Sequence, residues 1–142
     1  MLAVVQRVSM ASVSVDGELI SQIGPGMLVL AGIEKGDAEA QAERLARRLL
    51  ALRIFPSESG DMHEALGDRE ILCVSQFTLY GDTTKGNRPS WGKAAPGSEA
   101  EPLWDLLCEL LGAKRGVFGA MMQVDLTNDG PVTLLLEEPH AK

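Results

Sequence analysis

The residues best suited to chemistry lie in the segment Ser75–Asp82, which reads Ser-Gln-Phe-Thr-Leu-Tyr-Gly-Asp and follows an apolar run. If the segment continues as a strand, alternate side chains point to the same face. One face then carries two apolar and two hydrogen-bonding side chains: Leu72, Val74, Gln76 and Thr78. A few polar groups in an apolar concavity are typical of a ligand pocket. We therefore predict a strand over residues 70–80 that lines a pocket.

The chain offers few groups that could activate a nucleophile. Its two histidines, His63 in a predicted loop and His140 in a predicted frayed tail after Glu138, are both expected to be exposed and without function. Thr78 is the obvious nucleophile, but without a neighbouring base its hydroxyl is not activated. No clustered set of metal ligands, nucleotide-binding glycine motif or serine hydrolase motif occurs. We predict neither a metal nor a cofactor.

Composition and charge describe an ordinary globular protein. The chain has 142 residues, 45% of them hydrophobic and 23% charged, which fits a single domain over residues 1–142. No apolar run approaches the roughly 20 residues of a membrane helix, so no membrane partner is expected. Cys73 and Cys108 each lie in an apolar segment and are predicted to be buried thiols in a reducing cytoplasm.

The net charge of −7 argues against a protein that grips a long stretch of nucleic acid. One local exception is the basic group Lys85, Arg88 and Lys93, which follows the predicted pocket strand directly. A solvated loop is the ordinary interpretation of such a group, and its position beside the pocket raises the alternative of a contact for phosphate.

The elements that must position these residues are strands with two helices between them. Strands are predicted over residues 2–8, 11–15, 18–23, 27–33, 53–55, 121–127 and 132–137, with a hairpin turn at Asp16-Gly17. One helix is expected to begin at or near Asp37 as N-cap, with an apolar stripe through Ala38, Ala42, Leu45, Leu49 and Leu52.

The second helix is predicted to begin at a capping box formed by Ser98 and Glu101 and to end near Gly112. Its buried face is expected to consist of Leu103, Leu106, Leu107, Leu110 and Leu111. Between the two helices, residues 56–68 are predicted to form a loop. The fold class is therefore α+β, with a curved or barrel-like, mainly antiparallel β-sheet core and two main helices.

The segment Asn128–Thr133 contains the turn Asn-Asp-Gly-Pro between two predicted strands. By residue type it is an ordinary turn. Only about 5–6% of X-Pro bonds in folded proteins are cis, and the residues alone leave the state of the Gly130-Pro131 bond open.

Taken together, these segments resemble the D-aminoacyl-tRNA deacylase family of the bacterial and eukaryotic type. The matching segments occur in the family's order over nearly the whole chain: Gln6–Val8, Gly26–Gly32, Arg53–Phe55, Val74–Asp82, Lys85–Gly86, Arg88–Ser90, Phe118–Ala120 with Met122, and Asn128–Thr133. The chain departs from the family pattern at Thr84 and Asn87, where basic residues are usual, and at Trp91, where phenylalanine is usual.

The resemblance implies hydrolysis of the ester that joins a D-amino acid, or glycine, to the terminal adenosine of tRNA, with rejection of L-aminoacyl-tRNA. It assigns the adenosine pocket to Ser75, Gln76, Phe77, Thr78 and Leu79. It also implies a homodimer in which a cis Gly130-Pro131 unit enters the pocket of the other subunit, and Arg7 helps to hold that unit. Lys85 and Arg88 become phosphate contacts for the tRNA acceptor end.

The resemblance further implies that the 2′-hydroxyl of the tRNA assists catalysis. The protein then supplies position and oxyanion stabilisation, through backbone N–H groups near Phe77 and Thr78. Two alternatives stay open: a non-catalytic module that binds aminoacylated tRNA ends, and a small amino-acid ester hydrolase with no RNA partner.

Overall fold

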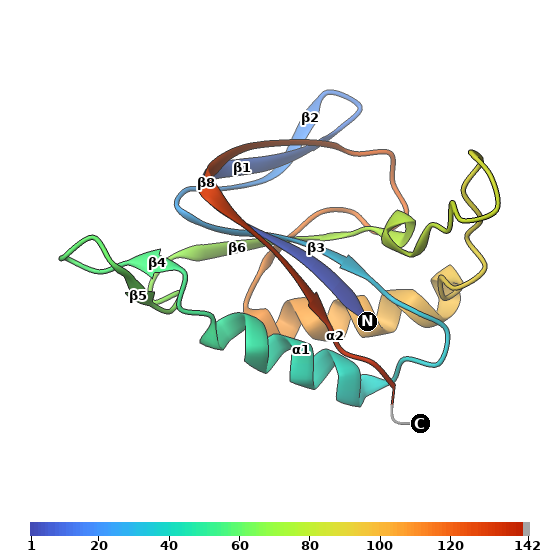
Figure 1. Cartoon of the computed structure of the whole chain (residues 1–142). Helices are drawn as coiled ribbons and strands as arrows, with labels where there is room; N and C mark the ends of the chain where they lie inside the picture. The colour runs from blue at the N-terminus through green and yellow to red at the C-terminus, as the bar shows by residue number, and fades with distance from the viewer. Residues whose placement is uncertain (141–142) are drawn as a thin grey trace.

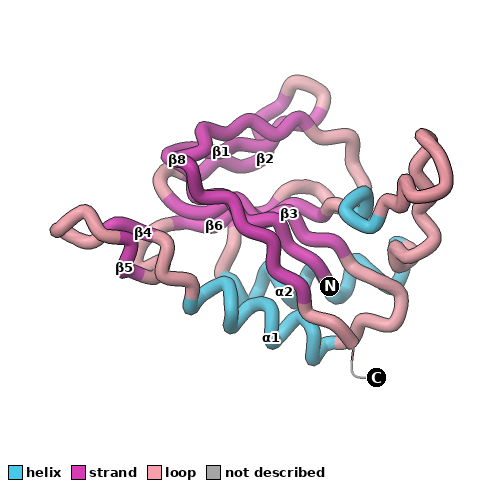
Figure 2. The backbone as a smooth tube through the Cα atoms, viewed as in Figure 1, coloured by secondary structure: helices cyan, strands magenta, loops and turns pink. Residues whose placement is uncertain are grey.

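The computed structural model describes residues 1–140 of the chain, and its path is shown in Figures 1 and 2. The elements in chain order are β1 (Leu2–Val15), β2 (Glu18–Ile23), β3 (Gly26–Gly32), α1 (Glu39–Ala51), β4 (Phe55–Pro56), β5 (Met62–Glu64), β6 (Glu70–Ser75), the 3₁₀ helix η1 (Phe77–Tyr80), α2 (Gly97–Leu111), β7 (Lys114–Arg115) and β8 (Gln123–Glu137).

The main sheet is mixed but mostly antiparallel. Its order is β2-β1-β3-β6-β7, and β8 pairs with β1 as well. Only the β3–β6 and β6–β7 pairings of this sheet are parallel. The long strand β1 pairs with β3 through its first half, with β2 through its second half, and with β8 along nearly its whole length. This arrangement curves the sheet, and the predicted α+β fold class is confirmed.

Both helices cover the same face of the sheet, as Figure 2 shows, and they contact each other. From α1, the side chains of Ala42, Leu45 and Leu49 are buried, as the predicted stripe requires. Leu52 is partly buried against the same core, whereas Ala38 is exposed, so the stripe was wrong only at its first residue. Among residues 1–140, no helix has the length and apolar character that a membrane crossing requires.

The prediction for the buried face of α2 is confirmed at Leu107 and Leu111, and Leu103 and Leu106 are partly buried against the core. The fully buried residues of α2 are Ala100, Trp104, Leu107, Cys108 and Leu111, whereas Leu110 is exposed. The prediction selected leucines by residue type and so included Leu110 and missed Ala100, Trp104 and Cys108. Burial on a helix depends on the angular position of a residue and not on its type alone. Cys73 and Cys108 are both buried free thiols, as expected. The hydrogen bond with the neighbouring Cys108 thiol, together with burial, raises the pKa of Cys73 well above its usual value.

The predicted start of α1 near Asp37 is confirmed to within one residue, whereas the predicted start of α2 is wrong. Helix α1 follows Ala38, whose N–H donates to Gln41 Oε1 at 2.7 Å, while the carboxylate of Asp37 accepts from the Glu34 N–H and the Met1 ammonium. Helix α2 follows Pro96, so that Ser98 and Glu101 both lie inside its first turns and form no capping box. Its predicted end is confirmed, because Gly112 adopts the left-handed conformation with φ of 62°.

Several strand boundaries also differ. Residues 2–15 form one strand instead of two, and residues 123–137 likewise form one strand that bends at the predicted turn. The predicted strand over 53–55 is a two-residue strand, β4, which pairs with β5 inside the predicted 56–68 loop. The Asp16-Gly17 hairpin is confirmed, with positive φ at both residues.

Candidate functional site

Strand β6 ends at Ser75, and the chain then turns into the 3₁₀ helix η1. The prediction of a strand through residue 80 was therefore wrong beyond residue 75. The neighbouring strand β3 ends at Gly32, and the last sheet bond runs from the Gln76 N–H to the Ala31 carbonyl at 2.8 Å. A Cβ at Gly32 would lie 3.2 Å from both Leu79 and Tyr80 side-chain atoms, so η1 packs closely over this glycine.

The turn opens a cavity of about 650 Å³ at the end of β6. Its walls come from β3, β6, η1, the start of α2 and the segment that leads into β8. The lining residues are Ala31, Ile33, Val74, Ser75, Gln76, Phe77, Trp91, Ala94, Ala95, Gly97, Ala100, Phe118, Gly119, Ala120, Met121, Met122, Gln123 and Val124. None of these described residues carries an ionisable side chain. The cavity can therefore position a ligand by shape and a few hydrogen bonds, but its lining supplies no acid or base.

Three of the five predicted pocket residues line this cavity: Ser75, Gln76 and Phe77. Thr78 is exposed beside it, and its hydroxyl accepts a hydrogen bond from Gln76 Nε2. Leu79 faces a second, smaller cavity on the other side of η1. The switch from strand to 3₁₀ helix explains this division, because side chains of a helix radiate in several directions and do not alternate between two faces.

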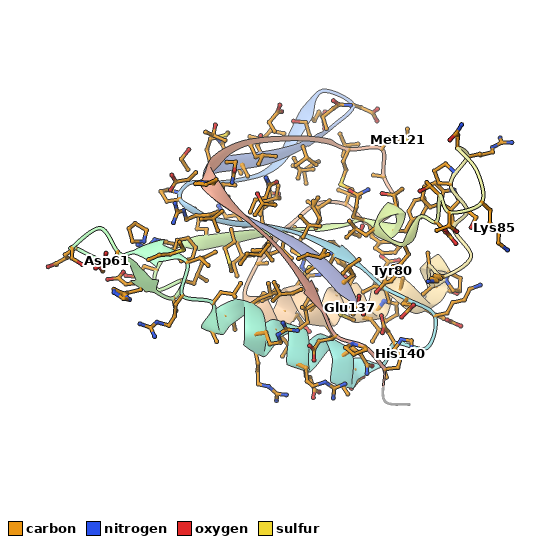
Figure 3. The ribbon with its side chains drawn as sticks, viewed as in Figure 1. Asp61, Tyr80, Lys85, Met121, Glu137 and His140 are labelled. Atoms are coloured by element: carbon orange, nitrogen blue, oxygen red, sulfur yellow. The ribbon has the colours of Figure 1, made fainter. Side chains whose placement is uncertain are left out.

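The opposite wall of the cavity was missed as a site by sequence reasoning. It is formed by Phe118–Val124, with Met121 90% exposed at the opening. Figure 3 shows Met121 at the outer edge of the molecule, where the chain enters β8. The only sequence signal for this wall was the match of Phe118–Ala120 and Met122 to the family pattern.

Arg7 lies in the middle of β1 and holds the turn of β8. Its Nε donates to the Asp129 carbonyl at 3.0 Å and lies 3.2 Å from the Asp129 carboxylate, while its Nη1 donates to the Ile54 carbonyl at 2.6 Å. Asn128 Nδ2 donates to the carbonyls of Arg7 and Val132 at 3.0 and 3.1 Å. Arginine therefore ties three separate segments together at this point.

The Gly130-Pro131 peptide bond is cis. The residues Asn128–Pro131 are all exposed, and none of them lines the 650 Å³ cavity of this chain. Figure 1 shows the bend of β8 on the side of the molecule away from η1. The structure therefore does not bring Arg7, Gly130 or Pro131 together with Ser75, Gln76 and Phe77 within one protomer.

The basic loop after η1 is held by hydrogen bonds where its two ends meet, and its basic side chains are exposed at the tip. Asp82 and Ser90 exchange two backbone hydrogen bonds of 2.9 Å, and Asp82 Oδ1 accepts from the backbone N–H and the hydroxyl of Thr84. These bonds from Thr84 lower the pKa of Asp82. Lys85 and Arg88 are exposed, and Lys85 points to solvent at the outer end of the loop in Figure 3.

The histidines contribute nothing to the cavity. His63 is exposed, as expected, and lies beside Arg53. His140 differs from the prediction, because its Nε2 lies 2.7 Å from the carboxylate of Asp37 instead of in a frayed tail. Residues 141–142 of the predicted tail lie outside the described residues. Glu34, Asp37 and His140 place possible ligand atoms within 4.8 Å of one another, but the Met1 ammonium already lies 2.9 Å from Asp37.

Comparisons with known proteins agree with this architecture. The family profile described as D-Tyr-tRNA(Tyr) deacylase matches residues 4–137. A protein named D-aminoacyl-tRNA deacylase from Xanthomonas axonopodis pv. citri is 51% identical over 144 residues, covering 96% of this chain and 99% of that protein. A protein of the same name from Myxococcus xanthus is 50% identical, covering 98% and 95%.

Two solved structures are similar over nearly the whole chain. The structure titled c-Myc DNA Unwinding Element Binding Protein superposes with a TM-score of 0.90 at 46% identity, covering 99% of this chain and 100% of that chain. A probable eukaryotic D-amino acid tRNA deacylase superposes with a TM-score of 0.80 at 15% identity, which shows the shared fold.

Proposed function

This chain belongs to the D-Tyr-tRNA(Tyr) deacylase family and is an enzyme, and we propose that it hydrolyses the ester of D-aminoacyl-tRNA to release free tRNA and the D-amino acid. We extend the proposal to glycyl-tRNA, because glycine has no side chain by which a site could exclude it. The proposed place of action is the cytoplasm, and the proposed unit is a single domain without metal or cofactor.

The cavity at the end of β6 is the observation that carries the proposal. Its volume of about 650 Å³ falls in the range of small-molecule sites and can hold a nucleoside with an attached amino acid. Its polar side chains are few, with Ser75, Gln76 and Gln123 among apolar walls. Such a lining suits a flat base and a sugar that need position more than chemical activation.

The proposed basis of D selectivity is the exposed turn of β8. In the proposed homodimer, Gly130 and Pro131 of one subunit enter the cavity of the other, where their carbonyl oxygens accept hydrogen bonds from the substrate ammonium. Proline has no N–H to compete for these acceptors. The backbone then occupies the space that an L side chain needs, so L-aminoacyl-tRNA is rejected by exclusion. The turn is held by Arg7 and Asn128, which supports a rigid role.

The proposed dimer is supported by the apolar side chains that β8 leaves exposed. Leu135 is 66% exposed and Leu134 38%, although both lie in the longest strand of the sheet. Covering such residues with a second copy removes apolar area from water. Light scattering of the purified protein is expected to give twice the mass of one chain, and the mass of a single chain would refute the cross-subunit mechanism.

The chemical step is proposed to depend on the substrate's own 2′-hydroxyl. The cavity lining has no ionisable side chain, and the hydroxyl of Thr78, just outside it, accepts a hydrogen bond from the uncharged Gln76 side chain. The protein's proposed contributions are the position of the ester and oxyanion stabilisation by the backbone N–H groups of Phe77 and Thr78. Lys85 and Arg88, exposed on the neighbouring loop, are proposed to contact phosphates of the acceptor end.

The proposed function is tested by comparing hydrolysis of one tRNA charged with a D-amino acid, the L-enantiomer and glycine. We expect cleavage of the D and glycyl esters and an L-ester rate near the uncatalysed rate. Binding without turnover would instead show a module that binds aminoacylated tRNA ends. Equal cleavage of a free amino-acid ester would show a small-ester hydrolase without an RNA partner.

A further inference from the structure

Trp91 lies at the base of the basic loop and forms part of the cavity wall. Its ring meets that of Phe77 at a centroid distance of 5.3 Å and an interplanar angle of 73°. Phe77 is 56% exposed and Trp91 42% exposed, so both rings keep free surface at the cavity. Two large aromatic rings at this angle form a corner that is open on the cavity side.

Two features hold the indole of Trp91 in this position. A Cβ at Gly81 would lie 2.7 Å from Trp91 Cζ3, so the indole occupies space that only glycine leaves free. The preceding residue, Ser90, is bonded through its backbone to Asp82 at 2.9 Å in both directions. The part of the cavity wall that Trp91 forms therefore belongs to the loop that carries Lys85 and Arg88, and not to strand β6.

An exposed aromatic corner beside a basic loop suits one ligand chemistry in particular. Nucleobases stack on aromatic side chains, and the adjoining phosphates are attracted by lysine and arginine. The rest of the cavity lining supplies no charge that would favour another ligand class. The corner and the loop thus match the two parts of a nucleotide.

We propose that Trp91 is a positioning residue for the substrate: its indole stacks with the base of the terminal nucleotide, while Phe77 borders the base at its edge. This inference rests on the proposed function and adds a residue to it. Because the base is remote from the ester, loss of the stacking contact weakens binding of the ground state and the transition state alike. Such a loss raises KM and leaves kcat nearly unchanged.

The test uses the full-length protein and adenosine 5′-monophosphate as the probe, with calorimetry for affinity. We expect Trp91→Ala to weaken binding by about tenfold, the order expected for one base–aromatic stacking contact, and Trp91→Phe to restore most of it. Gly81→Ala is expected to weaken binding as well, because the added methyl group displaces the indole. Met62→Ala serves as the control, since Met62 is a large exposed apolar residue of β5, outside the cavity.

Fluorescence gives a second measurement, because the other tryptophan, Trp104, is only 3% exposed and does not line the cavity. The probe is expected to quench the wild-type emission and to leave the emission of Trp91→Phe unchanged. A Trp91→Ala affinity within twofold of the wild type, or a variant with lowered kcat and unchanged KM, would overturn the inference. Wild-type protein that binds the probe with quenching but cleaves no D-aminoacyl-tRNA would refute the proposed function and support this inference.

Discussion

A D-aminoacyl-tRNA whose terminal ribose lacks the 2′-hydroxyl is expected to be cleaved at least about 100-fold more slowly than the same substrate with ribose. The reason is the composition of the cavity, whose described lining residues include no ionisable side chain that could act as a general acid or base. If the protein supplies only position, the substrate must supply the assisting hydroxyl. Single-turnover hydrolysis of the two substrates measures the effect, with the rate of each substrate alone subtracted. Equal rates would remove the proposed mechanism.

The corresponding change in the protein is Thr78→Ala, which tests whether a protein hydroxyl takes part in the reaction. Thr78 carries the hydroxyl that sequence reasoning singled out as a nucleophile, but it is exposed and contacts the uncharged side chain of Gln76. We expect this variant to keep its turnover within about tenfold of the wild type, since no base activates the hydroxyl. A fall to the uncatalysed rate would show instead that the protein provides the nucleophile.

The second large effect is expected from Arg7→Ala. This change removes the N–H donors to the Asp129 and Ile54 carbonyls and the ion pair with Asp129. A small shift of a positioning group can cost about 100-fold in rate, so we expect kcat/KM for the D substrate to fall by about that factor. Under the proposed mechanism a loosened turn excludes L side chains less strictly, so the D-to-L ratio of kcat/KM is expected to fall too.

Two further variants separate this role from general loss of stability. Arg7→Lys keeps the charge but not the planar fork of donors, so an intermediate effect is expected. Arg47→Ala removes an arginine that is exposed on α1, and it should change neither rate nor selectivity. Each hydrogen bond from a charged group contributes about 1.5–3 kcal/mol, so thermal unfolding of all variants must be measured in parallel. An Arg7→Ala enzyme with unchanged selectivity, folded at the assay temperature, would contradict the proposed role.

Local patterns in the sequence were enough to predict the class of the fold. The stripe Ala42, Leu45, Leu49 placed α1, and the Asp16-Gly17 pair placed the β1–β2 hairpin. Both features depend on residues within a few positions of one another, so neighbouring residues alone decide them. Val74 and Gln76 were placed at a pocket for the same reason, by the alternation within one short segment, and both line the cavity. Ser75 and Phe77 were assigned to it only through the family resemblance.

Other features depend on contacts between distant residues. Strand β6 ends at Ser75 because its neighbour β3 ends at Gly32, more than forty positions earlier in the chain. The opposite wall of the cavity comes from residues 118–124, and the turn at residues 128–131 is held by Arg7, at the other end of the chain. The residues of one segment alone therefore do not predict which distant segment it contacts.

The sequence by itself therefore determined the fold class, the two helices and the β1–β2 hairpin, and that a polar group follows the apolar part of β6. The tertiary structure decided where the strand stops, which residues close the cavity, and that the turn of β8 lies outside it. The physical reason is that periodicity and turn chemistry are local, whereas sheet register and cavity walls arise only when segments far apart in the chain pack together.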